Sequence, residues 1–126
     1  MSIFSRFFDR IKRFNEPLKK WYWVVFDEHK ITIKASPPGR DPWEQSVEWN
    51  RVIRVLFQGN GLEGSDEVIF WSDERPEGYV VPTECNGGSE IVNDLISRGY
   101  FASQKFTDAV LSPYGEYCWP EDEEST

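Results

Sequence analysis

The alternation of apolar and polar residues between positions 21 and 83 constrains the fold more than any other feature of the chain. "WYWVVF" at 21–26 and "KITIKA" at 30–35 flank the polar tetrapeptide "DEHK". This pattern predicts a hairpin with Ile31, Ile33 and Ala35 on one face. "EVIFWS" and "GYVVPT" flank "DERPE" in the same way, and its proline is typical of a turn.

A further strand pattern, "SVEWNRVIRVLFQ", lies between the two hairpins and follows the turn-rich loop "SPPGRDPW". We expect a tight turn at Trp49, Asn50 and Arg51 and a second strand through Val55 and Phe57. No connection is long enough to hold a crossover helix, so the strands should be antiparallel. The pattern predicts one sheet of about five strands.

Helical periodicity is found at both ends of the chain. Apolar residues at helical spacing over 1–14, ending at Asn15 and Pro17, predict an N-terminal helix. Near the C-terminus, Ile91, Val92, Leu95 and Ile96 form a stripe with Gly99 as its end signal, and a second helix is expected over 103–111. The predicted class is therefore α+β, with an amphipathic helix in 1–20, one domain over 21–120 and an acidic tail at 121–126.

The N-terminal helix has two interpretations. Its apolar face can pack on the domain, as the face of a one-sided helix usually does. Its basic residues also allow it to lie on an anionic membrane surface. In that case the membrane contacts would be Phe4, Phe7, Phe8, Arg10 and Phe14.

The charge is unevenly distributed. Residues 1–20 hold six basic and two acidic side chains, residues 21–59 hold five of each, and residues 60–126 hold three basic and fifteen acidic. A nucleic-acid binder needs a positive surface on its folded body, so we expect no nucleic-acid partner. No apolar run is long enough for a membrane span, and no signal-peptide core is present, so we expect a cytoplasmic protein with both cysteines reduced.

Several segments resemble known proteins. The succession "FDEHKITI", "VEWNRVIRVLF", "EVIFW" and "YVVPT", followed by a helix, resembles a bacterial PH-like domain. The segments "VVPTECNGG", "LISRGYF" and "CWP" resemble a group of small uncharacterised bacterial proteins. The PH-like resemblance implies a curved half-barrel sheet closed by a C-terminal helix, and a binding role.

The segment "PTECNGGSEI" is the strongest candidate for chemistry. It could be an anion-binding loop, or a plain strand-to-helix connection in which Gly87 and Gly88 turn the chain and Ser89 caps the helix. The second interpretation is favoured, since no lysine follows the glycines. Cys85 would need His29 as its base, and the pairing of Glu84 with Glu90 is one of many chance pairings of acids. We expect no catalytic residue, no cofactor and no metal site.

Aromatic residues interleaved with acids over 71–119 suggest a contact surface for a basic protein, although many of the rings could instead belong to the core. The candidate partner-binding residues are Trp71, Asp73, Glu74, Glu77, Tyr79, Glu84, Tyr114, Glu116, Tyr117 and Trp119. The resulting hypothesis is a non-enzymatic cytoplasmic protein-binding module, such as an immunity protein that neutralises a basic bacterial toxin. The alternative is a peripheral membrane or scaffold protein anchored through residues 1–20.

Overall fold

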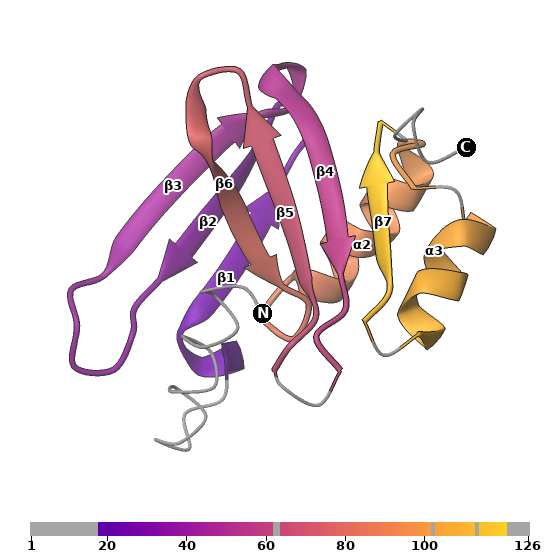
Figure 1. Ribbon diagram of the computed structural model, residues 1–126. Coiled ribbons are helices and arrows are strands. Elements are labelled where there is room, and N and C mark those ends of the chain that lie inside the picture. Colours follow the sequence, from indigo (N-terminus) through magenta and orange to yellow (C-terminus); the bar gives the residue numbers. More distant parts are fainter. Residues whose placement is uncertain (1–17, 62–63, 102, 113, 121–126) are drawn as a thin grey trace.

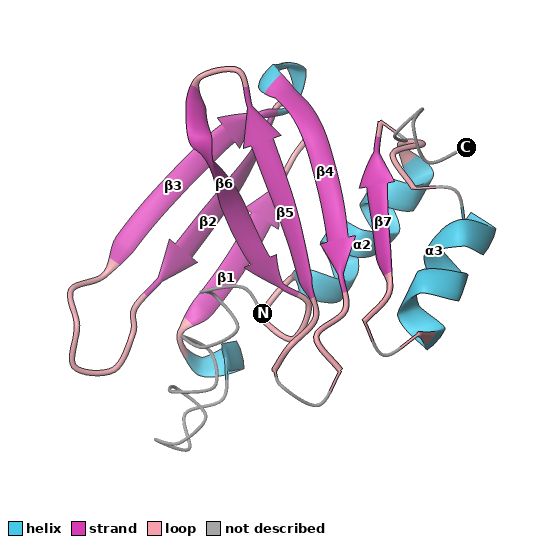
Figure 2. Ribbon diagram, in the orientation of Figure 1, coloured by secondary structure: helices cyan, strands magenta, loops and turns pink. Residues whose placement is uncertain are grey.

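The computed structural model describes residues 18–61, 64–101, 103–112 and 114–120, and strands dominate these ranges (Figure 2). In chain order the elements are the 3-10 turn η1 (Leu18–Lys20), β1 (Tyr22–Phe26), β2 (Lys30–Ala35), β3 (Trp43–Glu48), the 3-10 turn η2 (Trp49–Arg51), β4 (Val52–Gln58), β5 (Glu67–Ser72), β6 (Arg75–Pro82), α2 (Gly88–Ser97), α3 (Ser103–Leu111) and β7 (Glu116–Trp119).

The strands form two antiparallel sheets (Figure 1). Sheet A has the order β1-β2-β3, and sheet B has the order β6-β5-β4-β7. The prediction of one five-stranded sheet in an α+β fold was therefore wrong, because the described chain is mostly β. The two C-terminal helices are present: α2 runs behind β4 in the view of Figure 1, and α3 flanks β7.

The division into two sheets follows from the turn η2. The sequence predicted a tight turn at these three residues, but not that it would carry the chain from one sheet to the other. Trp49 is buried there, and its indole Nε1 donates a hydrogen bond to the Asp27 carbonyl oxygen at 2.8 Å. The chain thus leaves sheet A after β3. In a single continuous sheet β3 would pair with β4, but here β7 takes that place beside β4.

Both predicted hairpins are confirmed. β1 pairs with β2, and β5 pairs with β6. Ile31, Ile33 and Ala35 are buried on one face of β2, as their alternation predicted. The core continues through sheet B with Val55, Phe57, Val68 and Phe70.

The α2 stripe is also confirmed. Ile91 and Leu95 are fully buried, and Val92 and Ile96 pack at the margin of the core. Gly99 follows the helix with φ of 87°, and its N–H donates to the Ile96 carbonyl oxygen at 3.1 Å. This left-handed residue ends the helix as the sequence indicated.

The predicted N-terminal helix and its membrane-contact residues fall in 1–17, outside the described residues, as does the acidic tail at 121–126. Among the helices that the structure describes, none is long and apolar enough to cross a membrane.

Candidate interaction surface

The loop before α2 is packed tightly onto β1. The Val24 N–H donates to the Asn86 carbonyl oxygen at 2.8 Å, and the Asn86 N–H donates to the Tyr22 carbonyl oxygen at 3.1 Å. Gly87 has φ of 83°, and a Cβ on it would lie 2.1 Å from the Val24 carbonyl oxygen. The glycine is therefore needed for a close approach of two backbone segments. Ser89 is exposed and lies inside the helix, so its predicted role as the cap was wrong: Gly87 holds that position.

Cys85 and His29 lie at different places along β1. Cys85 is buried beside the start of the strand, where its thiol donates a weak hydrogen bond to the Asn86 carbonyl oxygen at 3.5 Å. His29 is exposed in the turn that follows the strand, and its backbone N–H donates to Asp27 Oδ1 at 2.7 Å. Glu84 is exposed. The structure thus does not assemble the Cys-His pair that nucleophilic catalysis would need.

Burial raises the pKa of the Cys85 thiol to about 12, so the thiolate form that reacts is scarce at neutral pH. We expect Cys85 to resist a thiol probe at pH 7–8 in the folded protein and to react once the chain is unfolded in urea. Cys118, which is only half-buried, serves as the internal comparison. Mass spectrometry of the labelled peptides measures both sites, and rapid labelling of Cys85 in the folded state would contradict the placement.

The same raised pKa has a consequence for stability at alkaline pH. An unfolded thiol ionises near its usual pKa of about 8.5, whereas the buried thiol stays neutral up to about 12. The stabilising contribution of Cys85 is therefore complete below about pH 8.5 and declines as the pH rises towards 12.

Possible metal ligands are dispersed in the same way. Across the residues that the structure describes, no three His, Cys, Asp or Glu side chains gather closely enough to hold a metal ion.

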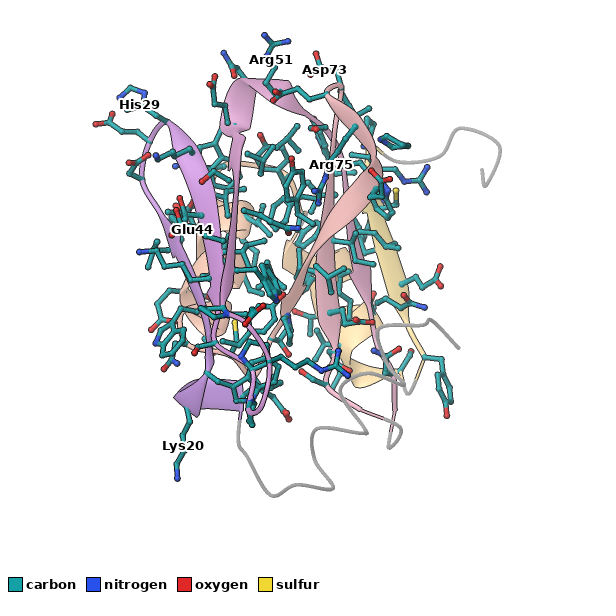
Figure 3. All side chains as sticks on the ribbon, turned by 90° about the vertical axis from the view of Figure 1, so that its left-hand side faces the viewer. Lys20, His29, Glu44, Arg51, Asp73 and Arg75 are labelled. Atoms are coloured by element: carbon teal, nitrogen blue, oxygen red, sulfur yellow. The ribbon has the colours of Figure 1, made fainter. Side chains whose placement is uncertain are left out.

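The predicted partner-binding residues fall at two ends of sheet B. At the β5–β6 turn, Asp73, Glu74 and Glu77 are exposed, and Asp73 forms an ion pair with Arg51 at 3.3 Å. Figure 3 shows Arg51, Asp73 and Arg75 at this end, far from Lys20. This end carries both signs of charge.

Two of the predicted aromatic residues at this end are covered by arginines. The guanidinium of Arg75 lies 3.7 Å from the ring centre of Tyr79, which is buried. The guanidinium of Arg54 lies 5.7 Å from the ring centre of Trp71. A hollow of about 420 Å³ opens beside Trp71 and is lined by both arginines and by Ile53. Because the lining is basic, it does not suit a basic partner.

The remaining predicted residues lie towards the other end of the sheet, except Trp119, which pairs with Val55 near the middle of β4. Glu116 lies opposite Gln58, at the end of β4 remote from the β5–β6 turn. Tyr117 and Trp119 are half-buried and pack edge-on against Phe101 and Tyr100, with ring centres 5.4 Å and 4.6 Å apart. These two rings therefore contribute mainly to the core.

An exposed apolar surface lies where α3 ends and β7 begins, and the sequence predicted only part of it. Leu111 is 78% exposed, Tyr114 is 62% exposed and Val110 is 45% exposed. We call these three residues, with the exposed acids Asp108 and Glu116, the α3–β7 patch. Within α3, Ala109 is buried and Phe106 is half-buried, whereas Val110 faces away from the core. A sequence signal was present, since apolar residues at 109, 110 and 111 cannot all lie on one narrow helix face.

The chain folds back on itself within the patch. The Ser112 N–H donates to the Ala109 carbonyl oxygen at 3.2 Å, and the Gly115 N–H donates to the Ser112 carbonyl oxygen at 3.2 Å. A Cβ on Gly115 would lie 2.1 Å from the Ala109 carbonyl oxygen. This close approach holds the turn that carries Tyr114 against the end of α3.

The two described charges of the patch, Asp108 and Glu116, are negative. After Lys105 the sequence contains six acidic residues and no basic residue. The patch therefore combines exposed apolar area with negative charge, as expected of a docking surface for a positively charged protein.

No family model, curated protein or solved structure matches the chain. The resemblance to bacterial PH-like domains therefore stays a prediction.

Proposed function

We propose that this chain is a non-enzymatic protein-binding module that docks a basic protein through the α3–β7 patch. The observation that carries the proposal is the exposure of Leu111 and Tyr114, at 78% and 62%, within an acidic segment of the chain. Large apolar side chains exposed close together mark interaction sites on protein surfaces.

The chemistry of the patch suits this role. Tyrosine rings contribute much of the binding energy at protein interfaces, while charges at the rim steer the encounter and increase the association rate. A basic partner would approach along the field of Asp108, Glu116 and the acidic C-terminal segment. The most specific form of the proposal is a cytoplasmic immunity protein that neutralises a basic bacterial toxin, such as a nuclease whose own substrate is polyanionic.

The test is affinity capture of partners from the source cell, followed by binding measurements with the purified partner. We expect one basic protein whose association slows as the salt concentration rises. The double variant Leu111→Ala, Tyr114→Ala should weaken binding by about 100-fold or more, because each residue is expected to be an interface anchor. The expected loss of about 2.7 kcal/mol corresponds to that factor.

The control is the double variant Val25→Ala, Ile53→Ala. These side chains are also large, apolar and more than half exposed, but they lie on β1 and β4. The control should bind like the parent. An acidic partner, or a partner that the Leu111 and Tyr114 variant retains at full affinity, would contradict the proposal. Binding to anionic lipid vesicles that requires residues 1–20 would instead support the membrane alternative.

A further inference from the structure

The two sheets have four outer edges, and three of them are covered or interrupted. The β1 edge carries the parallel bridge between Trp23 and Asn86. The β6 edge begins with Arg75 and Pro76, and the Tyr22 hydroxyl donates a hydrogen bond to its Val80 carbonyl oxygen. The β7 edge has α3 beside it (Figure 1).

Among the described residues, no element covers the fourth edge, β3. β3 is the outermost strand of sheet A in Figure 1, and β2 is its one partner among the described strands. Its six residue pairs with β2 run from Lys30 and Glu48 to Ala35 and Trp43 without a register shift, and the strand contains no proline. Within the described ranges, its backbone makes no hydrogen bond outside that ladder. A regular, exposed edge of this kind is a template for a further strand.

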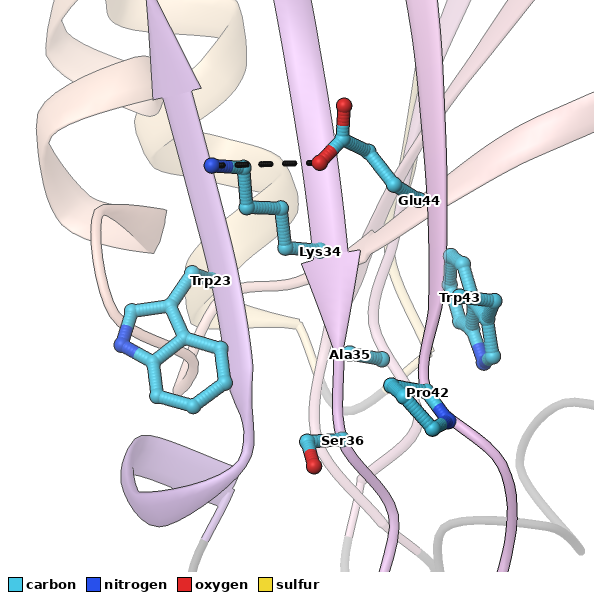
Figure 4. A pocket seen from close by; sticks show the side chains of 7 residues that line it. All are labelled: Trp23, Lys34, Ala35, Ser36, Pro42, Trp43 and Glu44. Carbon is cyan, nitrogen blue, oxygen red and sulfur yellow. Dashed lines mark ion pairs between the residues drawn. The ribbon is translucent and has the colours of Figure 1, made fainter.

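The outward face of β3 has a defined charge pattern. Lys34 and Glu44 are register partners and form an ion pair at 3.8 Å, which Figure 4 shows as a dashed line. Lys30 and Glu48 are partners in the same way at the other end of the strand. Each glutamate therefore has a lysine on the β2 side and an open position on the other side, where a basic side chain of an added strand would extend the row.

Between the two charged rows lies a row of small hydroxyl side chains. Thr32 and Ser46 are register partners, and their hydroxyl oxygens are 3.3 Å apart. The residue of an added strand that continues this row should be small or hydroxyl-bearing.

The inward face of β3 carries Trp43, Gln45 and Val47, the register partners of Ala35, Ile33 and Ile31. Val47 is 2% exposed, while Trp43, at the end of the strand, is 36% exposed and packs edge-on against Tyr22 with ring centres 5.7 Å apart. A hollow of about 340 Å³ lies at this end of the sheet on the side of the Lys34–Glu44 pair, and Trp23, Pro42 and Trp43 also line it (Figure 4). Apolar side chains of an added strand opposite Gln45 and Val47 would extend the core of sheet A, and an apolar residue one position beyond the partner of Glu44 would cover the exposed part of Trp43.

We propose that β3 accepts an extended segment of a partner protein as a fourth, antiparallel strand of sheet A. The part of the segment that pairs with β3 is five residues long. Its first and fifth residues are basic, its third residue is small or hydroxyl-bearing, and its second and fourth residues are apolar. The basic residues face Glu44 and Glu48, and the central residue faces Ser46. A second copy of this chain fits less well, since antiparallel pairing of β3 with itself would place Glu44 and Glu48 of both copies on one face.

This inference does not depend on the α3–β7 patch. β3 and α3 lie on opposite sides of the molecule in Figure 1. Substitutions in one surface therefore leave the other intact, and the two proposals can fail separately.

The test uses the full chain and a synthetic peptide with the core Lys-Val-Thr-Val-Lys, together with a comparison peptide in which both lysines are replaced by glutamate. Titration followed by NMR should shift the amide signals of Trp43–Glu48, and hydrogen exchange at those amides should slow when the lysine peptide is present. The lysine peptide should bind at least tenfold more tightly than the glutamate peptide.

The variant Glu44→Lys, Glu48→Lys should reverse this preference, since it makes the β3 residue of each charged row positive instead of negative. The matched control, Glu74→Lys, Glu77→Lys, makes the same change in net charge at the exposed β5–β6 turn and should keep the preference of the parent. Equal reversal in both variants would show a net-charge effect and overturn the proposal. So would peptide-induced shifts confined to other strands, the absence of binding, or self-association of the parent through β3.

Discussion

Replacing Leu95 with aspartate is expected to unfold the protein at ambient temperature. Leu95 is fully buried on the α2 face that packs into the core. The substitution removes apolar packing worth about 2–5 kcal/mol. It also places a carboxylate in an apolar site, which adds a cost of several kcal/mol. Together these costs approach or exceed a typical folding stability of about 5–15 kcal/mol.

Circular dichroism during urea and thermal unfolding measures the effect. The control is Asn93→Asp, which introduces the same carboxylate on an exposed position of α2 and should unfold close to the parent. If Leu95→Asp retained a cooperative transition within a few degrees of the parent, the packing of α2 described above would be wrong.

The features that the sequence predicted correctly depend on neighbours along the chain. The hairpin of β1 and β2 follows from alternation on either side of four polar residues. The α2 stripe follows from a spacing of three to four residues, and Gly99 marks its end. In each case the physical cause lies within about ten residues, so a single sequence is sufficient.

The division into two sheets depends instead on contacts between distant segments. Trp49 is held by a hydrogen bond to Asp27 and by stacking on Tyr100, with ring centres 5.7 Å apart. The Arg98 guanidinium lies 4.1 Å from the same indole. Residues about 20 and 50 positions away thus stabilise the turn that separates β3 from β4. Alternation along the chain carries no information about such partners.

The candidate surface was predicted in part for a related reason. Acids and aromatic residues are interleaved over 71–119, but strand register decides which of them meet. Register places Asp73 and Glu116 at opposite ends of sheet B, and it turns Trp119 towards Tyr100. Leu111 was missed although the helical pattern held a signal, because three consecutive apolar residues at 109–111 cannot all lie on one narrow helix face.

The second large effect is expected at Gly87, which the sequence marked as a turn residue and the structure places against β1. In Gly87→Ala the new Cβ would lie 2.1 Å from the Val24 carbonyl oxygen, a backbone atom that cannot move aside as a flexible side chain would. The loop must then separate from β1, which breaks the two backbone hydrogen bonds between Asn86 and the strand. Each bond contributes about 0.5–1.5 kcal/mol, and the left-handed conformation costs alanine a further 1–2 kcal/mol or so. We expect a loss of about 2–5 kcal/mol in the free energy of unfolding.

Gly99→Ala is the matched control, because it isolates the backbone conformation from the close approach. Gly99 has φ of 87°, almost the same as Gly87, but among the described residues other than its chain neighbours no atom lies within 4 Å of the position its Cβ would take. Its replacement should therefore cost only the conformational part, about 1–2 kcal/mol. Urea unfolding of both variants gives the difference, which should be about 1–3 kcal/mol. Equal losses would mean that the loop before α2 is not seated against Val24. A larger loss at Gly87, accompanied by faster hydrogen exchange at the Val24 and Asn86 amides, would locate the damage at this junction.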